Sequence, residues 1–355
     1  MSEFTESGLR AKIVNISATF EGAREGSEKH RLILATYNAY RPLPRGYVVQ
    51  ITDHWCATTT SAWAIMAELD KIIPIECSCS KLIALAKKMG IWIENDGYKP
   101  EPGDIVLYDW DDDGEGDCTG APEHIGLVTE RSGKSFRVRE GNFSNSVKCR
   151  SMQVNGRYIR GFICPDYKGE AKRRFDAAHV AGFADVDKGV YYEEALEWAK
   201  KEGITVGIDD THFAPENHCT RAEIVTMLHR FWCSVQPRTE IPFVDVPAGA
   251  YYYDAVVWAY DRGVIVGIDD DHFGPDQLCK RAEIVEMIYR LMAEPAIQDG
   301  NPFEDVPDGA WYVSAVAWAY EKGIIKGVSP VHFAPGAPVK RCEVVELLYR
   351  WNDLI

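Results

Sequence analysis

One pattern occurs three times in the second half of the chain, and it limits the possible folds more than any other feature. Segments that begin at Phe183, Phe243 and Phe303 align without a gap, so the pattern returns every 60 residues. One such unit cannot bury its apolar face alone, because it holds too few elements to form a core. Three copies of equal length therefore predict one domain with a pseudo-three-fold arrangement, in which neighbouring repeats complete each other's core.

Each repeat carries the signals of two helices. A stretch such as YYEEALEWAKKEG places apolar residues at helical spacing and ends at a glycine, which is Gly203 in the first repeat. A loop with a second glycine and an H-F-x-P turn follows, and TRAEIVTMLHRF then restarts the helical period. We expect an all-α domain in which each repeat is a helical hairpin. Three tryptophans fall on the apolar face of the first helix, where we expect core packing and where stacking on a sugar is the alternative: Trp198, Trp258 and Trp318.

The F-x-D-V opening, the central Trp-Ala, the G-[IV]-x-x-G loop, the F-x-P turn and the TRAE-like helix start resemble surface-layer homology (SLH) repeats. The resemblance covers about 182–235, 242–295 and 302–355. It implies non-covalent attachment to secondary cell-wall polysaccharides of Gram-positive bacteria, with ligand grooves between repeats around the TRAE arginine. The positions carried over are Arg221, Arg281 and Arg341, the loop glycines Gly207, Gly267 and Gly327, and the opening aspartates Asp185, Asp245 and Asp305.

The chemistry of the arginine agrees with such a groove. An Arg fork at the start of a helix, beside glycine-rich backbone, can bind a carboxylate or a ketal-bearing sugar through two hydrogen bonds. The alternative is that each Arg only pairs with an acidic neighbour such as Asp185, Asp245 or Asp305. The third repeat has KRCE in place of TRAE and GVSPVHF in place of GIDDDHF, so its groove is the least expected to bind.

The front of the chain has a different organisation. RLILATYNAY, CATTTSAWAIMAELDKI and SKLIALAKKMG are predicted helices, and GDIVLYDW, HIGLVTER, SFRVREGN and YIRGFICP are predicted short strands. Helices followed by a small antiparallel sheet indicate an α+β domain, which we place at residues 1–167. The short, highly charged segment 168–181 is predicted to link it to the repeat domain at 182–355.

Three chemically reactive residues stand in order in this domain. Cys56 lies in TDHWCATTTSAW, where Thr52 or Asp53 would begin a helix and leave the thiol in its first turn. That position favours the thiolate, because unpaired backbone N–H groups and the helix dipole stabilise negative charge. His124 begins one predicted strand and Glu140 ends the next, and adjacent antiparallel strands can hold them side by side. The set supplies a nucleophile, a base and an orienting group.

The linked motifs WCA to SAW, PGDIVLYDW, HIGLV, EGN and IRGFICPDY resemble the CHAP branch of the NlpC/P60-like cysteine peptidases and amidases, which cut bacterial peptidoglycan. The resemblance spans residues 8–167 and implies a papain-like fold. It implies that Cys56 attacks an amide carbonyl, that His124 takes its proton and later protonates the leaving amine, and that Glu140 orients the imidazole. Asn142 matches a second polar position of the family, and the Cys56 backbone N–H would contribute to the oxyanion hole.

An acidic loop, DWDDDGEGD, follows the first predicted strand. Asp109, Asp111 and Asp113 alternate and Gly114 follows them, as at the opening of a calcium loop. Gly120 stands where such a loop needs a bidentate Glu. Two interpretations remain, a calcium site and a solvated acidic loop beside the active site. The chemistry requires no other cofactor.

Charge and composition exclude several classes of protein. Residues 1–165 hold 20 Lys/Arg against 22 Asp/Glu, and residues 166–355 hold 19 against 32, which argues against nucleic-acid binding. No run approaches the roughly 18 apolar residues of a membrane-spanning helix, and MSEFTESGLRAK lacks the apolar core of an export signal. We therefore expect no membrane partner, synthesis in the cytoplasm without a signal peptide, and action at the cell wall after release. The ten cysteines are expected to be reduced.

These features predict an endolysin-like peptidoglycan hydrolase that cleaves an amide bond while its repeats hold it on wall polysaccharide. A host autolysin whose signal peptide is absent from this sequence, or a tail-associated wall hydrolase of a phage, would carry the same motifs. The alternative class is a non-catalytic wall-binding protein whose front domain has lost activity.

Overall fold

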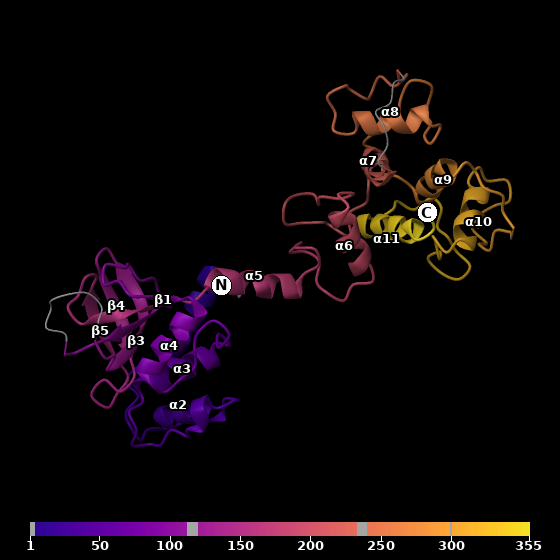
Figure 1. Ribbon diagram of the computed structural model, residues 1–355. Helices are drawn as coiled ribbons and strands as arrows, with labels where there is room; N and C mark the ends of the chain where they lie inside the picture. Colours follow the sequence, from indigo (N-terminus) through magenta and orange to yellow (C-terminus); the bar gives the residue numbers. More distant parts are fainter. Residues whose placement is uncertain (1–3, 112–119, 233–239, 299) are drawn as a thin grey trace. The chain divides into compact units, whose positions relative to one another are not determined.

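The computed structural model describes residues 4–111, 120–232, 240–298 and 300–355 (Figure 1). The chain divides into two compact units, Met1–Phe175 and Asp176–Ile355. The division falls inside the segment predicted as a linker, most of which forms helix α5 (Tyr167–Ala178). Tyr167 and Ala171 of this helix are buried in the core of the first unit, so its first turns belong to that unit. No helix among the described residues is long and apolar enough to cross a lipid bilayer.

Four helices open the first unit, and three of them were predicted. They are α1 (Glu6–Thr19), α2 (Glu28–Ala39), α3 (Cys56–Met66) and α4 (Cys79–Met89). The sequence analysis missed α1, whose start is nevertheless marked by a side-chain cap, because the Thr5 hydroxyl accepts a hydrogen bond from the Gly8 N–H. A single 3₁₀ turn, Pro44–Gly46, lies between α2 and α3.

The helices are followed by a six-stranded, fully antiparallel sheet in the order β1-β6-β2-β3-β4-β5. The strands are β1 (Trp92–Ile93), β2 (Ile105–Tyr108), β3 (His124–Ser132), β4 (Ser135–Glu140), β5 (Lys148–Gln153) and β6 (Ile159–Ile163). Alternate residues of β2 face opposite sides: Leu107 packs in the core with the helices, and Tyr108 packs in a second cluster. The predicted α+β order, helices before sheet, is confirmed.

The second unit contains the two helices predicted for each repeat. The first helices are α6 (Glu193–Lys201), α8 (Tyr253–Asp261) and α10 (Val313–Glu321), and the second helices are α7 (Arg221–Trp232), α9 (Arg281–Leu291) and α11 (Arg341–Asn352). Helix α7 packs on α8, α9 on α10, and α11 returns to α6. The hairpin prediction is therefore wrong in its pairing, because each second helix packs against the first helix of the next repeat.

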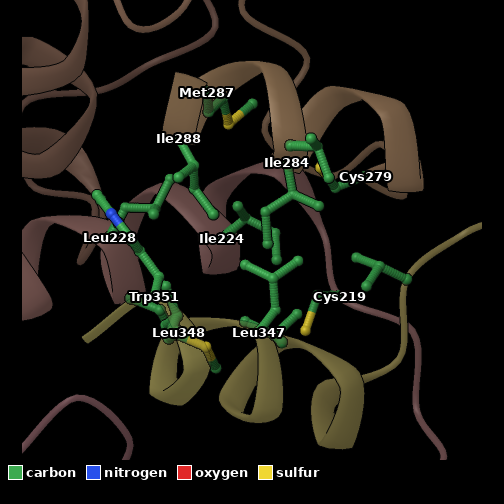
Figure 2. Close-up of a cluster of buried hydrophobic side chains, with 14 of the residues drawn as sticks. Cys219, Ile224, Leu228, Cys279, Ile284, Met287, Ile288, Leu347, Leu348 and Trp351 are labelled. Carbon is green, nitrogen blue, oxygen red and sulfur yellow. The ribbon is translucent and has the colours of Figure 1, made fainter. Parts of the chain in front are cut away.

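This exchange closes the three repeats into a ring. The second helices meet at its centre, where Leu228, Ile288 and Leu348 point into one buried cluster (Figure 2). Around them the backbone N–H of Cys219 donates to Val339 O at 2.9 Å, that of Cys279 to Cys219 O at 2.9 Å, and that of Val339 to Cys279 O at 3.0 Å. Each repeat both gives and receives one of these bonds, so the core is complete only when all three are present.

The repeat tryptophans pack as predicted. Trp258 and Trp318 are almost fully buried, and Trp198 packs against the edge of the same core beside Phe231 and Tyr349. Tyr349 belongs to the third repeat and Trp198 to the first, so this contact also joins the two ends of the ring.

Candidate functional site

Cys56 is the first residue of α3, and its side chain is buried. The helix starts later than the sequence suggested, with Trp55 at the N-cap and no side-chain cap. Asp53 does not cap it, because its carboxylate accepts hydrogen bonds from the Tyr47 hydroxyl and the Gln50 N–H, both at 2.7 Å. The thiol therefore lies at the positive end of the helix dipole with no carboxylate cap competing for it.

His124 and Glu140 come together as the strand pattern predicted. His124 opens β3, Glu140 closes the neighbouring strand β4, and His124 Nε2 lies 3.0 Å from Glu140 Oε2. The Glu140 side chain has no exposed surface. Its contact with Nε2 leaves Nδ1 as the imidazole nitrogen available to a proton donor or acceptor.

The three groups perturb each other's protonation. A hydrogen bond from the Cys79 thiol, together with hydrogen bonding and charge from His124, holds the pKa of Cys56 well below its ordinary value although burial opposes this. Burial alone would lower the pKa of His124, but Cys56 and Glu140 raise it to about 9. A lowered thiol pKa and a raised imidazole pKa favour a thiolate–imidazolium pair at neutral pH, which is the reactive form of a cysteine nucleophile.

Two glycines in the predicted motifs are required by close packing at this site. A Cβ on Gly126, two residues after His124, would lie 2.7 Å from Glu140 Cγ and closer still to Val138. A Cβ on Gly141 would overlap the side chain of Thr59 in α3. Because Gly126 has no side chain, the Glu140 side chain can lie against β3 and reach His124. Because Gly141 has none, the end of β4 can approach the helix that carries Cys56.

Replacing Gly126 with alanine is expected to destabilise the first unit by about 1–3 kcal/mol, because the new methyl group has no space. It should also displace Glu140 from His124 and slow any reaction that uses the pair. Chemical denaturation followed by circular dichroism measures the first effect. Gly249→Ala is the control, since a Cβ there meets nothing within 4 Å. Unchanged stability and activity would contradict this packing.

Asn142 lies near the site but bonds to neither Cys56 nor Glu140. Its Nδ2 is 3.5 Å from His54 Nδ1, and its Oδ1 is buried with no hydrogen-bond partner among the described residues. It borders an open cavity of about 230 Å³. The residues that line this cavity are Trp110, His124, Asn142, Phe143, Ser144 and Arg150.

Sequence reasoning missed three residues that contact the candidate catalytic groups. Cys79 opens α4 and reaches the Cys56 sulfur. The Tyr108 hydroxyl lies 3.1 Å from Glu140 Oε1, and Arg150 bonds to both oxygens of the same carboxylate. Of these, only Tyr108 stood in a quoted motif, and the strand that carries Arg150 was not predicted.

The calcium prediction stays untested. Asp113 lies outside the described residues. Asp109 is buried and accepts a hydrogen bond from the Asp111 N–H, so part of its binding capacity is already used by the loop itself. Among the described residues the geometry gathers three candidate metal ligands only at Asp269, Asp271 and His272, in the second repeat.

The three repeat arginines lie at equivalent positions between neighbouring repeats. Nε of Arg221 donates to Phe273 O, Nε of Arg281 to Phe333 O, and Nε of Arg341 to Phe213 O, at 2.8–3.0 Å. Each Nη1 pairs with the glutamate of the next repeat's second helix, namely Glu283, Glu343 and Glu223. The arginines thus belong to the junctions between repeats, as expected, and their acidic partners are these glutamates.

The opening aspartates hold the F-x-P turns, and their role in ligand binding stays a prediction. Both oxygens of Asp185 accept backbone N–H bonds from Phe213 and Ala214, and Asp245 and Asp305 hold the equivalent turns. They do not pair with the repeat arginines, and each carboxylate fixes the F-x-P turn of its own repeat. The glycines Gly207, Gly267 and Gly327 likewise allow the loop to pack on the opening phenylalanine, where a Cβ would collide.

The arginines differ in how much of the fork remains free. Nη2 of Arg221 donates to Val266 O at 3.0 Å, and Nη2 of Arg341 lies 3.5 Å from the Thr205 hydroxyl. Nη2 of Arg281 makes no hydrogen bond to any described residue. This side chain is also the most exposed of the three, at 13% against 7% and 4%. Arg281 therefore keeps both N–H groups of Nη2 for a ligand, whereas Arg221 and Arg341 each use one of theirs within the protein.

Arg281 borders a cavity of about 460 Å³ to which all three repeats contribute. Lys326 of the third repeat lines it and replaces the valines Val206 and Val266 of the other repeats. Tyr191 of the first repeat also lines it, with 66% of its surface exposed. The loop that departs from the repeat pattern thus borders a cavity with three cationic side chains, two carboxylates and an exposed aromatic ring; the further cation is Arg350, and the carboxylates are Glu343 and Glu346. Sequence reasoning missed both Lys326 and Tyr191.

Comparison with known proteins identifies the second unit. The S-layer homology domain model matches residues 182–225, 242–285 and 302–345, so this unit consists of three S-layer homology repeats. No CHAP or NlpC-type model matches the first unit.

Similar proteins include a cell surface protein of Thermoanaerobacter kivui, 31% identical over 31% of this chain. The surface-layer 125 kDa protein of Lysinibacillus sphaericus is 37% identical over 28% of the chain. Endo-1,4-beta-xylanase A of Thermoanaerobacterium saccharolyticum is 29% identical over 39%. The matches span 15%, 8% and 14% of those proteins, so they describe a shared module within otherwise different chains.

Proposed function

We propose that the protein is a peptidoglycan hydrolase whose first unit cleaves an amide bond while its S-layer homology repeats hold it on the cell wall. The observation that carries the proposal is the row Cys56–His124–Glu140, at the start of a helix and the ends of two adjacent strands. Its lowered thiol pKa and raised imidazole pKa are those of an activated nucleophile. The motifs around these residues, which resemble the CHAP peptidases and amidases with their papain-like fold, name peptidoglycan as the substrate.

The reaction would proceed through an acyl-enzyme. The Cys56 thiolate attacks the amide carbonyl, and the backbone N–H of Cys56 stabilises the developing oxyanion. Imidazolium His124 then protonates the amine as the C–N bond breaks, leaving a thioester. A water molecule, deprotonated by His124, attacks the thioester and releases the acid, which restores the thiolate and the imidazolium. Throughout, Glu140 stabilises the charged imidazole and holds its orientation.

The second unit would supply attachment to wall polysaccharide. Surface-layer and cell-surface proteins, as well as a xylanase, share this module, which supports a role in attachment independent of the attached domain. The cavity at Arg281 has three cationic side chains against two carboxylates, which pair with Arg281 and Arg350. Lys326, the free Nη2 of Arg281 and the exposed tyrosine ring suit an anionic sugar. Tethering raises the concentration of substrate near Cys56 without changing the site itself.

The test is mass spectrometry of purified Gram-positive peptidoglycan after digestion by the protein and by its Cys56→Ala variant. New amino termini or free stem peptides in the wild-type digest alone are expected, and they would identify the bond. Identical digests would refute catalysis by this cysteine.

An adhesive function is the second candidate, because the cell surface protein and the surface-layer protein named above share the repeats. In that case the first unit would be catalytically inert. Wall binding without any Cys56-dependent product distinguishes it from the hydrolase.

A further inference from the structure

Arg150, on β5, makes two parallel hydrogen bonds to the Glu140 carboxylate. Its Nε lies 2.7 Å from Oε1 and its Nη2 lies 3.0 Å from Oε2. The Tyr108 hydroxyl bonds to Oε1, and His124 Nε2 bonds to Oε2. Glu140 is thus a fully buried carboxylate with four donors, of which Arg150 supplies two.

Aromatic rings hold the guanidinium of Arg150 in place. Its Cζ lies 4.2 Å from the ring centre of Phe143 and 4.8 Å from that of Trp110. A planar guanidinium can stack on these rings and still present two N–H groups to one carboxylate, whereas an ammonium group cannot do both. The surroundings therefore favour arginine over lysine at this position.

The charges of the row require such a partner. A thiolate at Cys56, an imidazolium at His124 and a carboxylate at Glu140 leave one net negative charge in a mostly buried site. Arg150 makes the set neutral. Among the described residues, two other titratable groups contact the row itself: Tyr108 of β2 bonds to Glu140, and Cys79 of α4 bonds to Cys56. Three more contact residues beside the row: Lys148 lies over Phe143, Glu123 bonds to the Trp110 N–H, and His54 lies beside Asn142.

We propose that Arg150 is a positioning residue of this site, which fixes the Glu140 carboxylate against His124 and balances the charge of the Cys56–His124–Glu140 row. It acts through Glu140 and not on the substrate. The inference rests on the proposed function, but its test does not require peptidoglycan.

The readout is the rate at which iodoacetamide alkylates Cys56, followed on the Cys56 peptide by mass spectrometry across a range of pH. Alkylation needs the thiolate, so the rate falls at acidic pH as Cys56 takes up a proton. This acidic limb of the rate–pH profile therefore reports the pKa of Cys56. Removal of a nearby positive charge favours protonation, so Arg150→Met should move this limb to higher pH by about one unit. Arg150→Lys, which keeps the charge but loses the fork, should move it less.

Cleavage of wall fragments gives the second readout. Arg150→Met and Glu140→Gln are each expected to lower the rate by about 10- to 100-fold. Because Arg150 acts through Glu140, adding Arg150→Met to Glu140→Gln should cost little more, which a double-mutant cycle measures. A merely structural Arg150 would lower the amount of folded protein without moving the pH limb of what remains.

Two results would overturn the proposal: an acidic limb that Arg150→Met leaves in place, or a full additive loss of cleavage in the double variant. Failure of the proposed function would show itself differently. In that case the alkylation of Cys56 in the unmodified chain would follow the pH profile of an ordinary thiol. Alternatively, its acidic limb would lie at low pH as expected, but the chain would not cleave peptidoglycan.

Discussion

Cleavage of peptidoglycan should fall by about 10³-fold or more when His124 is replaced by alanine, because one side chain serves as both the base and the acid of the reaction. The pH profile should change as well. In the wild type, activity rises as pH passes the lowered pKa of Cys56 and falls as pH passes about 9, where His124 loses its proton. Without the imidazolium the alkaline limb should disappear, and the acidic limb should move to higher pH because the thiolate loses its cationic neighbour.

Alkylation of Cys56 and cleavage of wall fragments, each measured from pH 5 to pH 10, check the two parts of this expectation. His218→Ala is a suitable control, since this exposed histidine lies in the second unit. If His124→Ala retains both limbs of the wild-type profile, another group controls the thiol and the proposed role of His124 is wrong.

The position of the proposed catalytic row could be predicted because its members occupy regular elements with strong sequence signals. A histidine that opens one strand and a glutamate that closes the next must lie side by side in an antiparallel pair, and they do. Arg150 could not be predicted in this way, because KCRSMQ is mostly polar, lacks the alternation of a half-buried strand and lies at the sheet edge. Cys79 reaches Cys56 only through packing between two helices, and no sequence spacing encodes such a contact.

The repeat domain shows the same division between local and tertiary information. The 3.6-residue periodicity and the terminal glycines located all six helices, because these signals act within a few residues. A 60-residue period is equally compatible with pairing inside a repeat and with pairing to the next one. The choice depends on the ring of backbone bonds among Cys219, Cys279 and Val339, which no periodicity reveals. The same closure determines that Arg281, rather than Arg341, faces the atypical loop of the third repeat.

Binding of the chain to purified cell walls should weaken by about 10- to 100-fold when Arg281 is replaced by alanine, because a charge-assisted pair to an anionic sugar is lost from a partly buried site. The assay is co-sedimentation in a Cys56→Ala background, so that the wall is not digested. Replacing Arg221 or Arg341 with alanine should weaken binding less. Their forks are bonded to the protein itself, so these changes should mainly lower the melting temperature of the second unit.

Arg281 also bonds to Phe333 O and Glu343, so part of its effect on binding could come from the fold. Lys326→Val separates the two contributions, because it installs the residue of the other repeats at an exposed position and removes only a charge. We expect it to weaken binding by about 2- to 5-fold with no change in melting temperature, and to reduce the sensitivity of binding to salt. Equal losses for all three arginines, with Lys326→Val neutral, would mean that the ligand does not use the cavity at Arg281 in preference to the other two junctions.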